Sequence, residues 1–252
     1  MCFTEHWCKQ NIHLININGY TLMSAYTRPT VEHGGSCIYV RTDDVHHLGF
    51  EDIEKIQLFN IECHCECSGV VSVKLKLIVL CVYRPPKSNF TTFLDTLCLI
   101  LDECERNFNL YKIILCGDIN VDPIKSKNDC NNLRNILNSY NMSQKIDQPT
   151  RVTPTTSSIV DNVFVNFTEC DCSVVNFELS DHYGQIINIV TSEIKSQQKT
   201  ITYKRIISID KLAMYREELQ KVDWSYVYLE SNPNTAYNAF YNIIYSLLNR
   251  IF

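Results

Sequence analysis

The sequence lacks several features that would assign it to a protein class at once. It has no excess of basic residues, because 23 Lys and Arg stand against 28 Asp and Glu and the formal net charge is −5. A chain of that charge, with an isoelectric point near 5.8, is unlike a protein held on nucleic acid by bulk charge. An enzyme that binds a few phosphates through a metal ion could still be acidic overall.

Signals for secretion and membrane insertion are also missing. The N-terminus has no basic stretch followed by an apolar segment, which a signal peptide requires. The longest apolar run, Leu75 to Tyr83, is interrupted by Lys76 and is far too short to span a bilayer. We therefore expect a chain without a membrane span, soluble or attached to another component, and no membrane partner.

Zinc-like Cys-x-x-Cys pairs are absent, although the chain has 13 cysteines. Several of them lie within apolar runs, where a free thiol packs as a small hydrophobic side chain; examples are Cys37, Cys81, Cys98 and Cys116. This use of cysteine is typical of a reducing, intracellular compartment. We predict free thiols and no structural zinc.

The residues that are present fit one ordinary globular domain with an appendage. Of the 252 residues, 45% are hydrophobic and 20% are charged. After Ser192 the sequence becomes polar and linker-like, and helical spacing then predicts helices over Asp210 to Lys221 and Asn234 to Arg250. We therefore place one domain at residues 1–191 and a helical connector at residues 192–252.

A hairpin is predicted in the first half of the chain. Its arms would be Ile56 to Cys67 and Val70 to Tyr83, with the turn at Ser68 and Gly69. In the first arm, cysteines alternate with polar residues at a period of two, at Cys63, Cys65 and Cys67. This alternation favours a half-buried strand, with a three-thiolate metal site as the alternative, since metal sites usually have looped spacing.

Strands outnumber helices along the rest of the chain. Apolar residues at helical spacing predict helices over Asn89 to Arg106 and Asn131 to Tyr140. Runs rich in β-branched and aromatic residues predict strands at Ser36 to Val40, Ile159 to Val165 and Gln185 to Val190. Helices placed between pairs of strands favour a layered α/β or α+β sandwich over a regular βαβ barrel.

The segment from Leu110 to Asp122 is the centre of the pattern. Its apolar residues predict a buried strand that stops at Gly117, where the backbone can turn sharply or a ligand can approach closely. Asp118 and Asn120 follow, and in extended backbone they would share a face. A carboxylate and a carboxamide can hold a hard cation or orient a water against a phosphate. The alternative is an ordinary Asx-turn after the strand.

Two further acids and one histidine lie near predicted strand ends. Glu5 follows a short strand-like start and could be a metal ligand or an exposed glutamate. Asp161 lies within an apolar run, where an ionised carboxylate is costly unless it is paired. His182 is the candidate partner, and the alternative for it is a loop residue with local hydrogen bonds.

Taken in order, these clusters resemble the endonuclease/exonuclease/phosphatase superfamily. They are Thr4-Glu5-His6-Trp7, Tyr83-Arg84-Pro85-Pro86, Gly117-Asp118-Ile119-Asn120 and Ser180-Asp181-His182, with Asp161 between the last two. The match is closer to the apurinic-endonuclease-like domain of non-LTR retrotransposons and covers roughly residues 1–191. The loop Pro149-Thr150-Arg151 also looks like that subgroup.

The resemblance implies an α+β fold, a four-layered α/β/β/α sandwich of two mixed sheets flanked by helices, with the helical appendage after it. It implies phosphodiester cleavage with Mg²⁺, or Mn²⁺ in its place. Site roles carry over by motif. The catalytic residues would be His182, Asp118, Asn120, Asp161 and Tyr83. The metal ligands would be Glu5 and Asp181, and the substrate contacts Arg84, Thr150 and Arg151.

The same resemblance implies DNA as the substrate and a nuclear, intracellular setting. The parent would nick DNA to supply a primer 3′ end, within a polyprotein whose reverse transcriptase follows the connector. Two other functions stay open: a phosphoesterase of this fold acting on a lipid or inositol phosphate, and a non-catalytic remnant or binding module. The family's upstream strand, with its phosphate- or metal-binding asparagine, has no counterpart before Glu5, so we expect impaired activity from this chain.

Overall fold

The computed structural model describes residues 1–9, 11–123, 126–178, 180–190 and 208–252. The chain divides into two compact units, Met1–Ile194 and Lys195–Phe252.

A six-stranded sheet is the largest element of the first unit. Its strands run in the order β4 (Phe50–Asp52), β5 (Glu66–Ser72), β6 (Leu77–Tyr83), β7 (Lys112–Asp118), β11 (Asp161–Val165) and β8 (Ser143–Gln144). β6 and β7 are parallel, and the other neighbours are antiparallel. Since parallel neighbours need a crossover, the helix that joins β6 to β7 crosses one face of the sheet.

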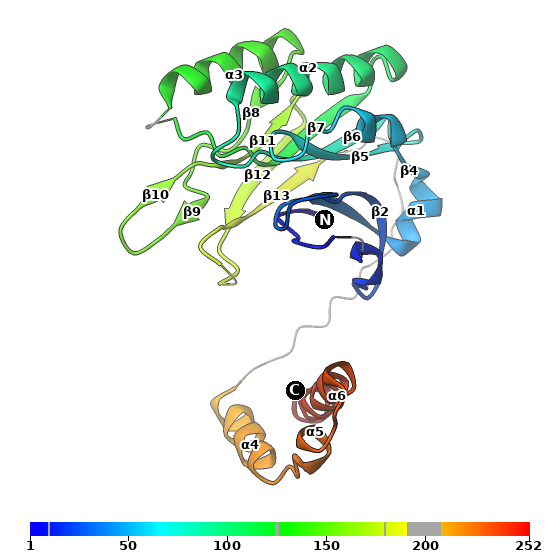
Figure 1. Ribbon diagram of the computed structural model, residues 1–252, viewed down its shortest axis with the longest axis vertical. Helices are drawn as coiled ribbons and strands as arrows, with labels where there is room; N and C mark the ends of the chain where they lie inside the picture. Colours follow the sequence, from blue (N-terminus) through cyan, green and yellow to red (C-terminus); the bar gives the residue numbers. More distant parts are fainter. Residues whose placement is uncertain (10, 124–125, 179, 191–207) are drawn as a thin grey trace. The chain divides into compact units, whose positions relative to one another are not determined.

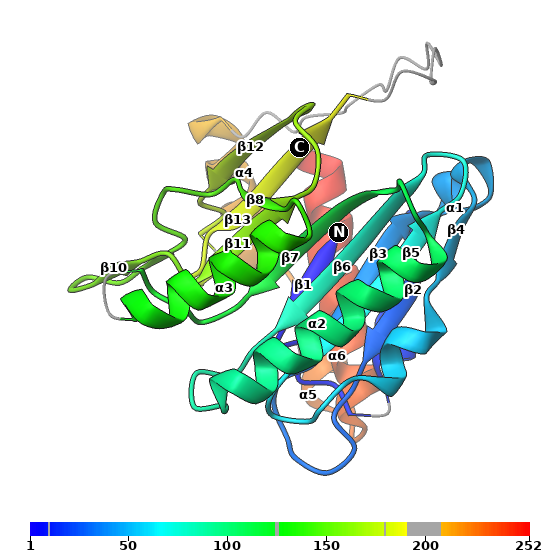
Figure 2. The same ribbon diagram turned by 90° about the horizontal axis from the view of Figure 1, so that it is seen from above.

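Two helices, α2 (Phe90–Asn107) and α3 (Lys127–Ser139), cover that face (Figure 2). The Asn89 side chain caps α2 by accepting a hydrogen bond from the amide of Thr92 at 3.0 Å. The apolar stripe of α2 is fully buried, with Phe93, Leu97 and Ile100 against the sheet. The two predicted helices are therefore present, with ends within a few residues of the expected ones.

Two smaller antiparallel sheets form the layer on the opposite face (Figure 1). The first has the order β1 (Cys2–Thr4), β3 (Ser36–Arg41), β2 (Tyr20–Tyr26) and packs Ile38 against Val70 and Cys81 of the large sheet. The second pairs β12 (Cys170–Val175) with β13 (Gly184–Ile189), which pack onto Ile114 and Val163. The sequence suggested one mixed sheet here, and the structure divides it into two.

The remaining elements connect these layers. The 3₁₀ helix η1 (Ile12–Leu14) packs Ile12 onto the outer side of β3, against Cys37 and Tyr39. Helix α1 (Thr42–Leu48) and the 3₁₀ helix η2 (Glu54–Leu58) precede and follow β4, and a small hairpin pairs β9 (Arg151–Val152) with β10 (Ser157–Ser158). The predicted α+β class, with packed sheets flanked by helices, is confirmed.

The predicted hairpin exists, but its turn was misplaced. Ser68 and Gly69 lie in the middle of β5, and the chain reverses at residues 73–76, where Lys76 has a φ of +49°. Small residues are required inside β5 for packing. The Ser68 hydroxyl contacts that of Ser36 at 2.9 Å, and a Cβ on Gly69 would lie 2.4 Å from Ile56 Cδ1. Ser-Gly therefore marks a close contact between layers, not a turn.

The alternating cysteine segment is not a strand arm. Ile61 and Cys65 form an isolated bridge around a tight turn in which Cys63 has a φ of +63°. Cys65 and Cys67 are buried as expected, but Glu66 is fully buried too, because it forms an ion pair. The cysteines of the chain are free thiols. That the protein binds no structural zinc stays a prediction.

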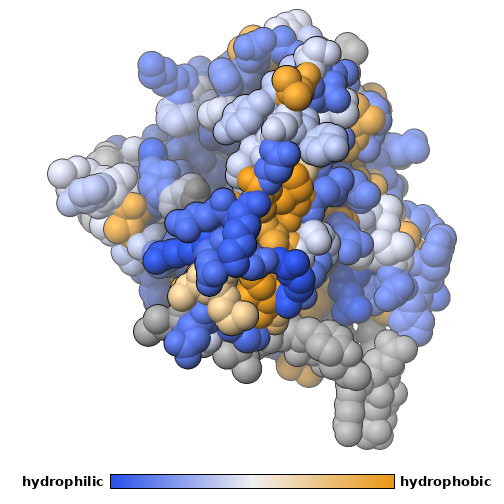
Figure 3. All heavy atoms as spheres, turned by 90° about the horizontal axis from the view of Figure 1, so that it is seen from below, coloured by the Kyte–Doolittle hydropathy of each residue, from blue (hydrophilic) through white to orange (hydrophobic). Residues whose placement is uncertain are grey.

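Residues 208–252, the described part of the second unit, contain three helices, α4 (Ile209–Gln220), α5 (Ser225–Tyr228) and α6 (Pro233–Ile251). Ser208 caps α4, its hydroxyl accepting from the amide of Lys211 at 3.3 Å, and Arg250 of α6 forms an ion pair with Glu218 of α4. Many apolar side chains of this unit are exposed, Leu229 and Phe240 among them. Figure 3 shows one face of the whole chain, on which orange, apolar residues lie among blue, hydrophilic ones. Within the described ranges, no helix is long and apolar enough to cross a membrane.

Candidate active site

Three neighbouring strands bring candidate residues into one row at the edge of the large sheet. Tyr83 ends β6 and Asp118 ends β7, and the two are register partners in the parallel pair. Asp161 begins β11 and is the register partner of Asp118 in the antiparallel pair. Side chains of register partners lie on the same face of a sheet. The row therefore places a phenol and two carboxylates side by side, all three residues being buried.

Gly117 is required where β7 ends. Its φ is +137°, and a Cβ there would lie 2.0 Å from the carbonyl oxygen of Val82. Asp118 then closes an Asx-turn, since its Oδ1 accepts from the amide of Asn120 at 3.1 Å. Asn120 has a φ of +53° and donates from Nδ2 to the carbonyl of Arg84 at 2.9 Å.

The expectation that Asp118 and Asn120 share a face of extended backbone was wrong, because the chain turns between them. The turn still places both residues at the same sheet edge. The Asx-turn and the candidate site, which the sequence presented as alternatives, therefore coexist.

His182 lies on the segment between β12 and β13 and hydrogen-bonds to Asp161. Its Nδ1 is 2.9 Å from Oδ2 and 3.2 Å from Oδ1 of that carboxylate, so the expected contact is present. A carboxylate beside Nδ1 holds the proton on that nitrogen and leaves Nε2 as the second functional atom. The hydrogen bond to Asp161 raises the pKa of His182 above its usual value.

Asp118 has the most perturbed carboxyl group of the row. Burial, followed by repulsion from the Asp161 carboxylate, raises its pKa to about 7, although nearby His182 opposes the rise. The negative charge of Glu5 also raises the pKa of Asp118, so Glu5 lies close to this carboxyl group. Carboxylates gathered in a buried place are stable in their ionised form only with a compensating cation.

The donor set of this place fits a divalent metal ion. One ligand atom each from Asp118, Asp161 and His182 lie within 4.8 Å of one another, and no other such group of three is found in the described ranges. Carboxylate oxygens are the ligands that hard cations prefer. The site can therefore hold a divalent cation, although Asp161 and His182 are also committed to each other.

The two metal ligands expected from the resemblance lie in other contacts. Glu5 accepts a hydrogen bond from the hydroxyl of Tyr83, and its own amide donates to the carbonyl of Gly35 at 2.8 Å. Burial and the Glu5 carboxylate raise the pKa of Tyr83 well above its usual range, so this phenol stays neutral. Asp181 forms an ion pair with Arg151 at 2.7 Å, which lowers the pKa of Asp181. Their metal roles stay predictions.

The residues expected to contact substrate divide into buried and exposed ones. Arg84 is buried, and its guanidinium donates to the carbonyls of Ile119 at 2.8 Å and Asn120 at 3.0 Å. Thr150 is fully buried, and its hydroxyl accepts from the amides of Val160 at 3.1 Å and Asp161 at 3.0 Å. These two side chains hold the site loops in place.

Arg151 is the exposed member of that set. It lies at the start of β9, and its backbone forms an isolated bridge with that of His182. Its side chain is 44% exposed, so it is the predicted substrate contact that solvent can reach.

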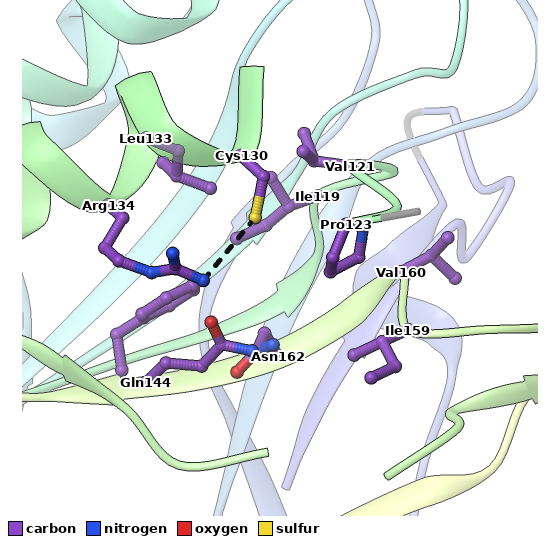
Figure 4. A pocket seen from close by; sticks show the side chains of 11 residues that line it. Ile119, Val121, Pro123, Cys130, Leu133, Arg134, Gln144, Ile159, Val160 and Asn162 are labelled. Carbon is purple, nitrogen blue, oxygen red and sulfur yellow. Dashed lines mark hydrogen bonds between the residues drawn. The ribbon is translucent and has the colours of Figure 1, made fainter. Parts of the chain in front are cut away.

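A nearby pocket is distinct from this row (Figure 4). It is lined from α3 and the adjoining strands by side chains such as Leu133, Ile119 and Asn162, and Arg134 Nη2 is 3.9 Å from Cys130 Sγ beside it. Asn162 follows Asp161 in β11, and successive strand residues point to opposite faces. The candidate acids therefore lie on the other side of the sheet from this pocket.

Comparison with known proteins finds a matching family and similar solved structures. A family described as endonuclease-reverse transcriptase matches residues 77–186, which include Tyr83, Asp118, Asp161 and His182. No curated protein sequence matches the chain. The endonuclease domain of TRAS1, a telomere-specific non-LTR retrotransposon, is similar in structure with a TM-score of 0.51 and 16% identity, covering 70% of this chain and 83% of that one.

Two other solved structures are more distant. D. rerio TDP2, complexed with a single-strand DNA product, has a TM-score of 0.48 and 13% identity, over 73% of this chain and 82% of that one. A Bacteroides thetaiotaomicron endonuclease/exonuclease/phosphatase family protein has a TM-score of 0.44 and 14% identity, over 68% and 73%. The family match over residues 77–186 and the fold shared with the TRAS1 endonuclease domain therefore support an assignment to the endonuclease/exonuclease/phosphatase class.

Proposed function

We propose that this chain is a Mg²⁺-dependent endonuclease domain that nicks DNA by phosphodiester hydrolysis. The observation that carries the proposal is the buried Asp118 carboxyl beside the hydrogen-bonded pair of Asp161 and His182. Without a cation, a pKa of about 7 lets Asp118 exchange a proton near neutral pH, and its ionised form supplies an oxygen ligand to a divalent cation. The same row would accept Mn²⁺, since both ions take oxygen ligands.

Each side chain has a role that follows from its surroundings. Asp118, with Glu5 and Asp181 as the resemblance implies, would hold the cation. Mg²⁺ supplies charge neutralisation on the phosphate and a more acidic bound water. Asp161 fixes the Nδ1–H form of His182, so that the other ring nitrogen can donate to a phosphate oxygen as negative charge develops.

Neutral donors complete the site. Tyr83 keeps its proton because of burial and Glu5. Once Glu5 binds the cation, the single O–H of Tyr83 would be released from Glu5 and could donate to a non-bridging oxygen. Asn120 has its Nδ2 on the carbonyl of Arg84, which leaves Oδ1 to accept a hydrogen bond from the attacking water. In this account Arg84 and Thr150 position the loops, and Arg151 is the side chain that contacts the DNA backbone.

DNA is the proposed substrate because of the family resemblance. The matching family is described by endonuclease and reverse transcriptase, and TRAS1 is a retrotransposon endonuclease. By the same likeness, the domain would act in the nucleus as part of a longer chain with a reverse transcriptase. With a net charge of −5, recognition would rest on a few phosphate contacts rather than on bulk charge.

Nicking of supercoiled plasmid with Mg²⁺ tests the proposal through His182. His182→Ala should lower the nicking rate on the order of 10²–10⁴-fold, because it removes the imidazole that would stabilise negative charge developing on the phosphate. His46→Ala is the matched control, since His46 is exposed on α1, and it should leave the rate unchanged. Equal rates for His182→Ala and the unaltered chain would show that the site is misassigned.

A further inference from the structure

The most enclosed ion pair of the described residues lies beside the candidate site and has no role in the account above. Arg28 Nε is 2.6 Å from Glu66 Oε1, and the two side chains are 9% and 0% exposed. In the part of the chain that the structure describes, no other ion pair has both side chains below one tenth exposed. Burying two charges carries a desolvation penalty that stability alone rarely justifies.

Glu66 extends the active-site row by one strand. It begins β5 and is the register partner of Tyr83, just as Tyr83 is of Asp118 and Asp118 is of Asp161. Four neighbouring strands therefore contribute Glu66, Tyr83, Asp118 and Asp161 to one line on one face. Glu66 does not stand out in the sequence, because it lies among alternating cysteines.

The Glu66 carboxylate organises the loop that holds Glu5. Besides Arg28, it accepts from the amides of Gly35 at 2.6 Å and Cys63 at 3.0 Å. The carbonyl of Gly35 in turn accepts from the amide of Glu5 at 2.8 Å. One residue, Gly35, thus separates the buried carboxylate from the backbone of the proposed metal ligand.

Arg28 reaches the other partner of the same contact. Its guanidinium carbon lies 5.8 Å from the centre of the Tyr83 ring, and the Tyr83 hydroxyl donates to Glu5. The guanidinium fits because residue 34 is glycine: a Cβ there would lie 2.3 Å from Arg28 Cζ. Trp7 is tied to this loop as well, its amide donating to the carbonyl of Gly34 at 3.1 Å.

We propose that Arg28 and Glu66 form a positioning pair that fixes Glu5 and Tyr83 relative to each other at the active site. The pair holds Glu5 through Gly35 and packs its guanidinium over Tyr83, so both ends of the Glu5–Tyr83 contact depend on it. The catalytic part of this inference rests on the proposed endonuclease function. The structural part, the fixing of the Glu5 to Trp7 segment, does not.

Glu66→Gln is the central variant, because an amide has one acceptor oxygen for the three donors that the carboxylate serves. It should lower plasmid nicking on the order of 10–100-fold, as expected for a small displacement of a catalytic group. Glu103→Gln is the control: Glu103 is also a buried glutamate with ion pairs, to Lys55 and Arg106, but it lies on α2. It should leave the nicking rate of folded protein within about twofold.

A double-mutant cycle with Glu5→Gln separates positioning from general damage. If the pair acts by holding Glu5 in place, adding Glu66→Gln to Glu5→Gln should lower the rate by no more than about twofold. A reduction as large as in the unaltered background would overturn the proposal. Arg28→Lys, which keeps the charge and loses the guanidinium, is the second variant should Glu66→Gln fail to fold, and it should behave the same way.

Trp7 gives a readout that needs no activity. The chain has two tryptophans, so Trp224→Phe leaves Trp7, next to the Glu5 segment, as the sole tryptophan. In that background Glu66→Gln should lower Trp7 anisotropy and increase acrylamide quenching, and Glu103→Gln should change neither. This result without any nicking would keep the positioning pair and reject the endonuclease function. Unchanged Trp7 signals in both Glu66→Gln and Arg28→Lys would reject the pair, whatever the activity.

Discussion

At the scale of the residue, Asp118 combines a structural cost with the proposed chemistry. Its carboxyl is buried, faces the carboxylate of its register partner Asp161, and has its pKa raised to about 7. The folded chain therefore binds a proton at Asp118 between about pH 4 and 7 that the unfolded chain has already released. The free energy of unfolding must then fall as the pH rises through this range.

Asp118→Asn should relieve this loss. Without divalent ions, the variant should be more stable than the unaltered chain at pH 8, with a difference that closes near pH 4. The gap between about 7 and the ordinary pKa of about 3.9 limits the effect to about 4 kcal/mol. His182 has its pKa raised as well, so its stabilisation is also lost with rising pH, and some slope persists in the variant.

Thermal unfolding in EDTA at several pH values measures this difference. Asp171→Asn serves as control, because Asp171 is exposed on β12. If Asp118→Asn loses as much stability between pH 4 and pH 8 as Asp171→Asn does, the raised pKa of Asp118 does not arise from its burial beside Asp161.

A second prediction concerns the buried hydroxyl of Thr150. Its buried hydroxyl accepts from the amides of Val160 and Asp161, and Thr150→Val has nearly the same shape without the acceptor. Leaving buried amides without partners costs about 1–3 kcal/mol. We expect the variant to be destabilised by about 2 kcal/mol in urea unfolding, with Thr150→Ser close to the unaltered chain. Equal stability of Val and Ser variants would show that the hydroxyl does not hold Asp161.

At the scale of the element, the end of β7 depends on the absence of a side chain at Gly117. Gly117→Ala combines a φ of +137° with a Cβ 2.0 Å from the Val82 carbonyl, so β6 and β7 would have to separate at the site. Gly19→Ala is the matched comparison, with a φ of +79° and open space around the new Cβ. We expect Gly19→Ala to cost about 1 kcal/mol and Gly117→Ala at least about 3 kcal/mol. Urea denaturation of the two variants decides, and equal costs would contradict the steric argument.

The elements also show which sequence patterns predict structure. The stripe of α2 from Phe93 to Cys104 predicted a helix, since periodic burial needs no distant partner to be recognised. The position of the hairpin turn could not be predicted in that way. Ser68 and Gly69 resemble a turn. They are small because Ser36 of β3 contacts Ser68 and Ile56 of η2 packs against Gly69. Such contacts depend on tertiary packing, which local propensity does not contain.

At the scale of the whole molecule, strand order creates the site. Tyr83, Asp118 and Asp161 are far apart in the chain and meet because β6, β7 and β11 are neighbours in register. Motif order predicted that these residues belong together, and the Asp161–His182 contact is present. The roles of Arg84 and Thr150 could not be predicted, because their exposure depends on the loops that fold over them. Glu66 was missed because it stands among alternating cysteines, where its burial by an ion pair leaves no local signal.

The central claim is that Asp118 and its neighbours hydrolyse phosphodiesters with a divalent cation. Plasmid nicking by the unaltered chain and by Asp118→Asn, each with Mg²⁺ and with EDTA, tests it most directly. We expect nicking by the unaltered chain with Mg²⁺, none with EDTA, and a rate for Asp118→Asn lower on the order of a hundredfold or more. Nicking that persists in EDTA, or that Asp118→Asn leaves at full rate, would contradict the account.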